Sequence, residues 1–595
     1  MTSLNQDLYK YLNVRGAYHP QVLPNQQALT FISKKTGIPQ VWKWDAVTTK
    51  IQQYSHLPDR VLSVHHSPSG KQTIIGMDEK GNEKQQLYIL HESSLNAKEL
   101  VISKEHFHEF GGWSPDESKI AFTSNRRHPG YFDVFIMDLE TKTEKVVYQI
   151  DGNCTPIGWT KDGEQLILSM PDTNIDQSYY ILNLEKKKLF KLFESNSLAR
   201  YQSLQLSKNG EKGFLLTDVN QNTLGIHQFT FKGTYELQQL LTIDKWDIEE
   251  IKLSPDNSLL AFTINEGGYS RLGVYDLTKQ IHRYIDGLPI GVIDSLTWLN
   301  DNEICLGLKS PIIPGDIWKI SLENNQVERI TFMGEEKDVE HLWQEPELCT
   351  FTSFDGLEVS YFLYGKKKNI QPVVVYVHGG PESQIRAEYN PVIQYLAANG
   401  FAVAAPNVRG SMGYGRTYVK LDDVRKRMDS VADLKWLAED LVHTHGADPK
   451  RIGIMGRSYG GFMVLAALTH YADIWAAGVD IVGISHFKSF LQNTGSWRRK
   501  LREFEYGSLK EDGEFFEEIA PLNHTDKIKV PLLIFHGRND TRVPVSEAEQ
   551  LTADLKEQGK QVELFIFEDE GHQTEKIENH IKMNTKIVQF MQKFL

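Results

Sequence analysis

The pattern of hydrophobic and polar positions divides the chain into two parts with different periodicities. Between residues 20 and 340, short apolar runs with strand-like alternation recur between turn residues, without a helical period. From about residue 346, continuous apolar runs alternate with stretches of helical period. Because the chain has 595 residues, which is too long for a single hydrophobic core, the two patterns predict at least two domains.

The first part repeats a turn at nearly constant intervals. Turn sequences such as Ser114-Pro115-Asp116-Glu117 begin at positions 67, 114, 160, 207 and 254, and weaker copies at 23 and 299 bring the number of units to seven. Units of this length built from short strands are typical of β-propeller blades. We therefore predict a seven-bladed β-propeller over residues 20–340, preceded by a separate segment of residues 1–19. A sandwich or two tandem β domains is the alternative, which the regular spacing disfavours.

The second part, residues 341–595, predicts an α/β-hydrolase domain. Apolar strands that alternate with helices are typical of a mostly parallel sheet with helices on both faces. In such sheets, functional residues gather at the carboxyl ends of the strands. The expected strands include 373–377, 401–405, 452–455, 532–535 and 562–567, and the expected helices include 430–443, 461–470, 546–558 and 576–594.

A nucleophile-elbow pattern stands between one of these strands and the following helix. The run Gly456-Arg457-Ser458-Tyr459-Gly460-Gly461 follows the strand 452–455 directly. In this motif a sharp turn lifts a serine above the sheet, and small flanking residues leave room for the strand and the helix to close around it. Taken alone, the pattern also fits a glycine-rich turn without chemistry, so the neighbouring strand ends decide between the two interpretations.

Two further residues at strand ends complete a catalytic triad. Asp540 follows the strand that ends at Phe535, and His572 follows the next strand, so the order is that of an α/β-hydrolase. A serine hydroxyl needs a base before it can attack a carbonyl. We predict that His572 moves the proton of Ser458 and that Asp540 fixes the imidazole tautomer. The backbone N–H of Tyr459 and one from residues 378–381 would form the oxyanion hole.

Composition and charge exclude several other classes of protein. The formal net charge of −13, spread along the chain, argues against nucleic-acid and anionic-membrane partners. The sequence contains no run of about 18 apolar residues and no signal-like start, so we expect a cytoplasmic protein without a membrane span. Three distant cysteines indicate a reducing compartment. The histidine pairs at 65–66 and 106/108 lack ligands at metal-binding spacing, so neither a metal nor another cofactor is expected.

Together these motifs resemble the prolyl oligopeptidase family of serine peptidases, most closely its acylaminoacyl-peptidase-like branch. The resemblance implies that the Gly380 N–H is an oxyanion donor and that Arg542 binds a substrate backbone carbonyl. From the residues alone, a salt bridge that shapes the loop is an equal alternative for Arg542. Gln573-Thr574 depart from the family, which often has glycine directly after the histidine. The matching runs are 378–381, 407–415, 456–461, 540–544 and 570–572.

Residues after 482 give a prediction about the acyl-side pocket. Four apolar side chains there predict a pocket for an apolar residue before the scissile bond, with ordinary core packing as the alternative. The arginines and lysine that follow, at 498–500 and 502, predict a solvated helix face. The predicted pocket residues are Phe487, Phe490, Leu491 and Trp497.

The predicted function is a serine hydrolase that cleaves short or N-blocked peptides through an acyl-enzyme at Ser458, with entry restricted by the propeller. The substrate is thus a short peptide or a small acyl compound, and a homo-oligomer is compatible with this interpretation. Two alternatives stay open: an esterase or amide hydrolase of a small metabolite, and a non-catalytic binding propeller with an inactive hydrolase domain. Glu249-Glu250 and Glu335-Glu336 match the paired N-terminus anchors of dipeptidyl-peptidase relatives by residue type only, so aminodipeptidase activity is not predicted.

Overall fold

In the computed structural model, the chain forms two compact units. One unit consists of Arg15–Gly334, and the other joins Met1–Val14 to Glu335–Leu595. The structure describes residues 3–195, 197–231, 235–333, 340–365 and 372–595. The glutamate pair at 335–336 lies outside the described residues. Each unit has its own hydrophobic core.

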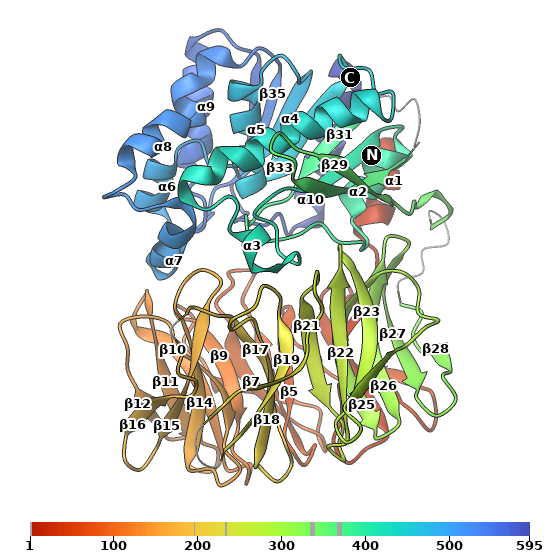
Figure 1. Cartoon of the computed structure of the whole chain (residues 1–595), viewed down its shortest axis with the longest axis vertical. Helices are drawn as coiled ribbons and strands as arrows, with labels where there is room; N and C mark the ends of the chain where they lie inside the picture. The colour runs from red at the N-terminus through yellow and green to blue at the C-terminus, as the bar shows by residue number, and fades with distance from the viewer. Residues whose placement is uncertain (1–2, 196, 232–234, 334–339, 366–371) are drawn as a thin grey trace. The chain divides into compact units, whose positions relative to one another are not determined.

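The first unit is a seven-bladed β-propeller (Figure 1). Each blade is a four-stranded antiparallel sheet of consecutive strands. Blades one to four comprise β1 (Ala17–Val22), β2 (Ala28–Ser33), β3 (Gln40–Asp45), β4 (Ile51–Gln53); β5 (Val61–His66), β6 (Gln72–Met77), β7 (Gln86–His91), β8 (Ala97–Val101); β9 (His108–Trp113), β10 (Lys119–His128), β11 (Tyr131–Asp138), β12 (Glu144–Tyr148); and β13 (Thr155–Trp159), β14 (Gln165–Pro171), β15 (Gln177–Asn183), β16 (Lys188–Lys191). Blades five to seven comprise β17 (Tyr201–Leu206), β18 (Lys212–Thr217), β19 (Gly225–Thr230), β20 (Gln238–Leu241); β21 (Ile248–Leu253), β22 (Leu259–Glu266), β23 (Tyr269–Asp276), β24 (Ile281–Tyr284); and β25 (Val292–Asn300), β26 (Glu303–Ser310), β27 (Ile313–Ser321), β28 (Val327–Arg329).

The repeated turns of the sequence join the first and second strands of their blades. The turn at Ser114 closes with a hydrogen bond from its N–H to the Lys119 carbonyl, 2.9 Å long, and the turn at Ser254 closes in the same way on Leu259 at 2.9 Å. In the five clear turns, which begin at 67, 114, 160, 207 and 254, the fourth residue has a positive φ, for example +61° at Glu117. This left-handed conformation favours glycine and asparagine. The repeat in the sequence therefore corresponds to one turn between the first two strands of each blade.

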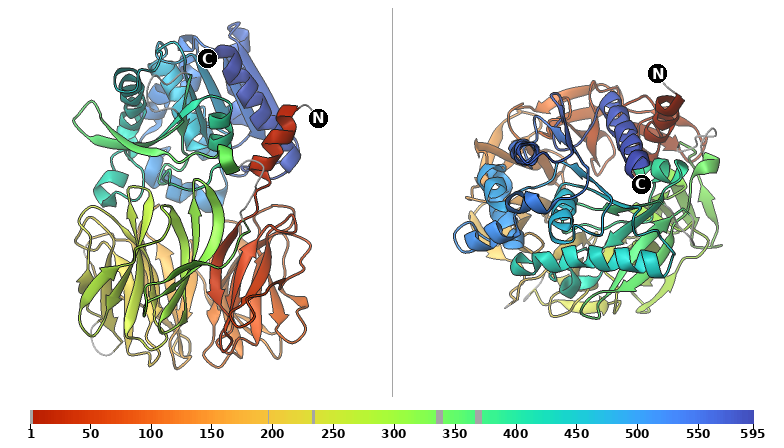
Figure 2. Two further views of the ribbon diagram at one scale, coloured as in Figure 1. Left: turned by 90° about the vertical axis from the view of Figure 1, so that its right-hand side faces the viewer. Right: turned by 90° about the horizontal axis from the view of Figure 1, so that it is seen from above.

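The ring closes by packing between the first and the last blade (Figure 2). The Val22 N–H on β1 donates to the Thr297 hydroxyl on β25 over 3.4 Å. An apolar cluster also joins the two blades, with Phe31 and Trp42 from the first and Cys305 from the last. Each blade buries its faces against its neighbours in this way, which is why a blade is stable only within the ring.

The second unit is built on one eight-stranded sheet with the order β29-β30-β32-β31-β33-β34-β35-β36. The pairs β29–β30 and β30–β32 are antiparallel, and the remaining pairs are parallel. The strands are β29 (Glu347–Thr352), β30 (Glu358–Tyr364), β31 (Val373–Val377), β32 (Ala402–Asn407), β33 (Ile452–Arg457), β34 (Ala477–Ile481), β35 (Leu532–Gly537) and β36 (Val562–Phe567). The helices are α1 (Ser3–Leu12), α2 (Pro391–Ala398), α3 (Gly415–Val419), α4 (Arg427–His443), α5 (Tyr459–His470), α6 (Phe487–Asn493), α7 (Ser496–Tyr506), α8 (Gly513–Ile519), α9 (Ser546–Glu557) and α10 (Ile577–Phe594), with 3-10 turns η1 (Glu340–Leu342), η2 (Val424–Lys426) and η3 (Pro521–Lys527).

The N-terminal helix α1 belongs to this second unit, where it packs on α2 and α10. The Tyr11 ring meets the Tyr395 ring edge-on at 5.5 Å, and the Tyr389 hydroxyl donates to the Tyr11 carbonyl over 3.1 Å. The fold class predicted from the sequence, a seven-bladed propeller followed by an α/β-hydrolase domain, is confirmed. Among the described residues, no helix has the length and hydrophobicity that crossing a membrane requires.

Candidate active site

Ser458 stands at the sharp turn between β33 and α5, in a backbone conformation that serine rarely adopts. Its φ is 60° and its ψ is −122°. Such strained conformations persist only where the surroundings over-determine them. Here the Ser458 N–H donates to the Ile481 carbonyl over 2.9 Å, and a β-carbon on Gly456 would lie only 2.3 Å from the Gly460 carbonyl oxygen. The tight closure between strand and helix explains the glycines of the elbow.

Replacing Gly460 by alanine tests this closure. The added methyl group would lie 2.4 Å from the Val377 carbonyl oxygen and 2.7 Å from that of His378, and backbone atoms of a central strand yield little. We expect Gly460→Ala to lower the free energy of unfolding by about 1–3 kcal/mol through overpacking. Urea unfolding measures the loss. Gly513→Ala is the control, because a β-carbon there meets nothing within 4 Å; equal stability of the two variants would contradict the argument.

The three predicted catalytic side chains form one hydrogen-bonded chain. His572 Nε2 lies 3.1 Å from Ser458 Oγ, and His572 Nδ1 lies 2.7 Å from Asp540 Oδ2. The second oxygen of Asp540 accepts the N–H groups of Arg542 and Val543 at 2.8 and 2.9 Å. Burial raises the pKa of Asp540, but the hydrogen bond and charge of His572 outweigh it and hold the pKa below its ordinary value. The aspartate is therefore ionised and oriented toward the imidazole.

Two contacts that the sequence did not predict hold the histidine loop. Arg457, which precedes the serine, donates to the His572 carbonyl over 2.7 Å and to the Thr574 hydroxyl over 3.3 Å. The Glu570 carboxylate accepts the backbone N–H groups of residues 575 and 576, each at 3.0 Å. Arg457 thus ties the base to the same turn that carries the nucleophile. The elbow motif leaves its second position unspecified, so sequence reasoning had no signal for it.

The glycine run after β31 lies directly against the nucleophile. A β-carbon on Gly379 would lie 3.3 Å from Ser458 Cβ. Gly380 has a φ of +131°, and its N–H donates to no other group in the described part of the chain. Tyr459 is the first residue of α5, so its N–H has no carbonyl one turn earlier in the helix. Two backbone donors are therefore available beside Ser458, as an oxyanion hole requires.

The loop after β32 supports the glycine run from behind. His378 Nε2 lies 2.9 Å from the Ser411 hydroxyl, and the Met412 N–H donates to the Ser383 carbonyl over 2.9 Å. Burial lowers the pKa of His378, so this histidine is neutral. It acts as a hydrogen-bonded spacer between the two loops.

The apolar residues predicted to line an acyl-side pocket lie deeper than an open pocket wall. Phe487 and Phe490 are each 1% exposed and Leu491 is fully buried, whereas Trp497 is partly exposed. The rings of Phe487 and Phe490 pack against the Tyr506 ring at 4.8 and 5.8 Å. These three side chains are part of the hydrophobic core of the unit. Their contact with a substrate stays a prediction.

The predicted solvated face of α7 is wrong for Arg502. Its side chain is 15% exposed and forms a 3.0 Å ion pair with Glu382, whose side chain is 8% exposed. The reason is the direction of α7, which turns this face toward the glycine run, while Lys500 on another face is exposed. Arg542 is partly exposed in the loop after Asp540, and its role in binding substrate stays a prediction.

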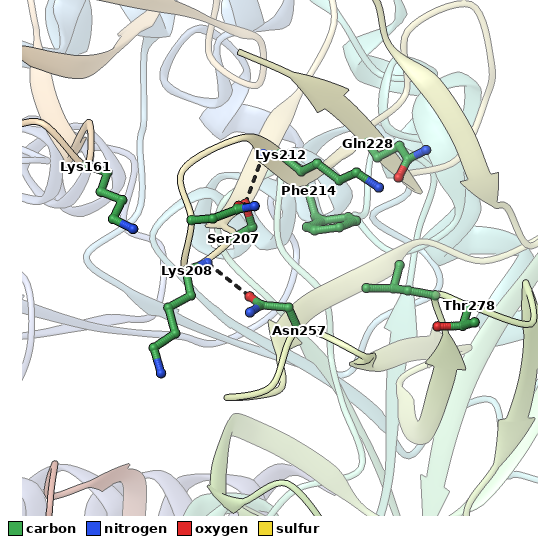
Figure 3. Close-up of a pocket in the computed structure, with 10 residues that line it drawn as sticks. Lys161, Ser207, Lys208, Lys212, Phe214, Gln228, Asn257 and Thr278 are labelled. Atoms are coloured by element: carbon green, nitrogen blue, oxygen red, sulfur yellow. Dashed lines mark hydrogen bonds between the residues drawn. The ribbon is translucent and has the colours of Figure 1, made fainter. Parts of the chain in front are cut away.

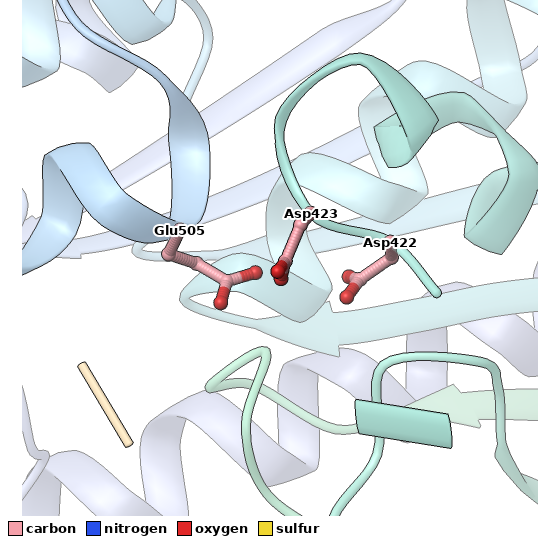
Figure 4. A group of neighbouring side chains, drawn as sticks. All are labelled: Asp422, Asp423 and Glu505. Carbon is pink, nitrogen blue, oxygen red and sulfur yellow. The ribbon is translucent and has the colours of Figure 1, made fainter. Parts of the chain in front are cut away.

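Three carboxylates lie close together in the second unit (Figure 4): Asp422, Asp423 and Glu505, whose oxygens lie within 4.8 Å of one another. The guanidinium of Arg427, which is 1% exposed, forms ion pairs with both Asp422 and Glu505. It also donates to the Tyr459 hydroxyl over 3.0 Å. A protein cation therefore supplies the positive charge at this cluster, and we assign no metal to it. The network anchors the tyrosine side chain that follows the nucleophile.

A separate pocket of about 650 Å³ opens among the turns of neighbouring propeller blades (Figure 3). Lys161, Lys208 and Lys212 contribute to its lining, and the Lys208 N–H donates to the Asn257 side chain over 3.1 Å. Among its described lining residues, no histidine or carboxylate accompanies the Ser207 hydroxyl, which donates to the Asn209 side-chain oxygen over 2.7 Å. Since a hydroxyl without a base is a weak nucleophile, we assign no reaction to this pocket.

Comparisons with known proteins show which proteins the second unit resembles in sequence. Residues 387–595 match the sequence model of the prolyl oligopeptidase family. Over 230 residues the chain is 34% identical to dipeptidyl aminopeptidase BIII of Pseudoxanthomonas mexicana, covering 37% of this chain and 33% of that protein. Over another 230-residue alignment it is 27% identical to the acylamino-acid-releasing enzyme of Arabidopsis thaliana, covering 36% and 30%. The chain thus spans about a third of the length of these curated relatives.

A solved structure extends the likeness to both units. A puromycin-hydrolyzing peptidase of Mycobacterium tuberculosis is similar with a TM-score of 0.86, over 99% of this chain and 96% of that chain, at 18% sequence identity. At this identity the likeness shows the fold alone. It agrees with the predicted combination of a propeller and an α/β-hydrolase domain.

Proposed function

Because residues 387–595 belong to the prolyl oligopeptidase family, we propose that this chain is a serine peptidase that cleaves short or N-blocked peptides through an acyl-enzyme at Ser458. The observation that carries the proposal is the hydrogen-bonded chain from Asp540 through His572 to Ser458, with distances of 2.7 and 3.1 Å. Two backbone N–H groups stand beside the serine, and these five groups are the parts that acyl transfer needs.

The proposed reaction follows from the positions of these groups. His572 Nε2 takes the proton of the Ser458 hydroxyl as Oγ bonds to the substrate carbonyl carbon. The carbonyl oxygen becomes an oxyanion, which the N–H groups of Gly380 and Tyr459 stabilise; one such donor contributes about 3–4 kcal/mol. Collapse of this intermediate breaks the C–N bond, and His572 gives its proton to the leaving amine. Water then attacks the acyl-enzyme by the same steps and releases the acid.

The substrate class and the compartment are parts of the proposal with separate support. One curated relative is named for releasing acylated amino acids, which supports blocked peptides as substrates. Arg542 would hold a backbone carbonyl of the peptide, and the propeller would restrict entry to short chains. A series of peptides of increasing length tests the restriction, with kcat/KM expected to fall as the chain lengthens. The free thiols Cys154 and Cys305 are buried, which fits a reducing compartment such as the cytoplasm.

A fluorophosphonate probe tests the nucleophile directly. We expect covalent labelling of the wild-type chain and no labelling of Ser458→Ala, with mass spectrometry of the labelled peptide to locate the adduct. Equal labelling of both would show that Ser458 is not the nucleophile. No labelling of either would favour an inactive hydrolase domain. Comparing kcat/KM for blocked peptide amides and simple esters then separates a peptidase from an esterase. Ester cleavage without peptide cleavage would overturn the peptidase proposal.

A further inference from the structure

One face of α7 carries two arginines and a tyrosine at helical spacing. Arg498, Arg502 and Tyr506 are four residues apart, so they form a row along the same side of the helix. The row begins near the Asp540 loop and ends beside the glycine run, which contains the oxyanion donor Gly380. We call these three residues the α7 row.

The second half of the α7 row touches the glycine run. Arg502 Nη1 lies 3.4 Å from the Gly380 carbonyl oxygen, and the Tyr506 hydroxyl lies 3.3 Å from the same oxygen. Gly380 is also the residue whose N–H is free to donate to an oxyanion. These side chains are therefore close to the position where the carbonyl of the acyl group binds.

The first half of the α7 row is tied to the loop after Asp540. The Thr494 hydroxyl donates to the Arg542 carbonyl over 2.8 Å, and the Gly495 N–H donates to the Thr541 carbonyl over 3.2 Å. Arg498 follows within one helical turn. Burial, together with the positive charges of Arg502 and Arg542, lowers the pKa of Arg498 to about 10. The three guanidinium groups therefore share one neighbourhood.

Most charged groups in this neighbourhood have a bonded partner. Arg502 is paired with Glu382 at 3.0 Å, and Asp540 holds His572 at 2.7 Å. Glu505, on the same helix, is directed to Arg427. The Arg498 guanidinium, in contrast, makes no ion pair or hydrogen bond with any residue that the structure describes. Asp540 and Tyr506 favour its charge without bonding to the guanidinium. A half-buried guanidinium with no bonded counterion favours the arrival of an anion.

We propose that Arg498, supported by Arg502, forms an anion subsite for the carboxylate of an acidic residue directly before the scissile bond. This inference rests on the proposed function. The carboxylate belongs to the acyl side because the α7 row touches the Gly380 loop, where the acyl carbonyl binds. In the substrate, the side chain of the residue before the scissile bond is attached to the α-carbon next to this carbonyl. A guanidinium presents two parallel N–H groups that match a carboxylate. This proposal differs from the apolar preference that the sequence predicts, and the substrates below distinguish the two.

The test compares two blocked substrates of nearly equal shape, with glutamate or glutamine before a 4-nitroanilide leaving group. We expect the wild-type chain to prefer glutamate about 10- to 100-fold in kcat/KM, the size of one charge-assisted interaction. The preference should disappear below about pH 4, where the glutamate side chain is protonated. A wild-type glutamate-to-glutamine ratio near one at neutral pH would overturn the inference.

Variants assign the preference to a residue. We expect Arg498→Gln to reduce the glutamate-to-glutamine ratio at least tenfold, and Arg498→Lys to restore part of it. Lys500→Gln removes the same charge from an exposed position of the same helix and should keep the wild-type ratio. An unchanged ratio in Arg498→Gln would contradict the assignment. The wild-type ratio needs no variant, so the inference stays testable if a variant fails to fold.

Two further readouts separate the alternatives. Suppose that fluorophosphonate labels Ser458 and the glutamine substrate is cleaved, but the glutamate substrate has no higher kcat/KM. The anion subsite is then rejected, and the proposed function stands. If Ser458 is not labelled, the proposed function fails first. Blocked dipeptides with a free or an amidated C-terminus test the leaving side: a preference for the free carboxylate that Arg498→Gln removes would overturn the acyl-side placement.

Discussion

Replacing Asp540 with asparagine is expected to lower kcat about 10⁴-fold, the loss typical of serine peptidase triads. Asp540 Oδ1 accepts two backbone N–H groups, from Arg542 and Val543. The asparagine carbonyl would keep these bonds, so its NH₂ group would face His572 in place of Oδ2. His572 Nδ1 would then have to accept a hydrogen bond, which places the ring proton on Nε2. In that tautomer Nε2 cannot accept the proton of Ser458.

Steady-state kinetics measure this effect, and we expect KM to change far less than kcat. Asp569→Asn is the matched control, because it removes a carboxylate from the neighbouring loop, where the side chain is 51% exposed. We expect the control to stay within twofold of the wild type. An Asp540→Asn variant that retains a tenth of the wild-type kcat would show that the aspartate does not set the tautomer.

The same variant has a predicted dependence on pH. The pKa of Asp540 is lower in the folded chain than in the unfolded chain. Its contribution to stability is therefore present above the unfolded value of about 3.9 and is lost as the pH falls through the folded value. We expect the stability difference between Asp540→Asn and wild type to shrink as the pH falls below about 4. Thermal unfolding between pH 3 and pH 7 measures it.

The fold could be predicted because its signals are local. Five blades repeat a turn whose fourth residue has a positive φ, and at four of these positions the residue type favours that conformation: Gly70, Gly163, Gly210 and Asn257. The buried parallel strands appear as continuous apolar runs because helices cover both faces of the sheet. The docking of α1 could not be predicted, because it depends on the pairing of Tyr11 with Tyr395, nearly four hundred positions later. No local sequence pattern indicates such a contact.

Some residues of the candidate site could also be predicted from local signals, and others could not. Ser458, Asp540 and His572 could be found because each follows a strand, and strand ends of a parallel sheet meet at one edge. Arg457 and Glu570 were missed because they bind backbone groups of the histidine loop, and such contacts need no particular residue type in the partner. For Phe487 the sequence leaves a core position and a pocket position open, because an apolar cluster has the same appearance in both.

The largest expected loss of stability comes from Arg427→Ala, at about 3–5 kcal/mol, the range for breaking a buried ion pair by removal of one partner. Arg427, Asp422 and Glu505 have side chains that are each 1% exposed. Removal of the guanidinium leaves two buried carboxylates without a counterion. The Tyr459 hydroxyl also loses its bond to the arginine, so we expect slower fluorophosphonate labelling of Ser458 in the variant. Urea unfolding and the labelling rate measure the two effects.

Arg425→Ala provides the control for Arg427→Ala, because Arg425 forms an ion pair with Asp512 but its side chain is 66% exposed. Exposed ion pairs contribute about 0–1 kcal/mol, so the control should lose little. A loss of similar size in both variants would mean that burial of the network has no special energetic weight.

The pH dependence of the Arg427→Ala loss identifies the carboxylates as its cause. Burial raises the pKa of both Asp422 and Glu505, and the charge of Arg427 opposes this rise. Without Arg427, the folded chain binds more protons than the unfolded chain between the unfolded pKa values of about 4 and the raised folded values. The free energy of unfolding of the variant must then fall as the pH rises. We expect a larger loss at pH 8 than at pH 5; a loss that is independent of pH would point to packing around the missing side chain instead.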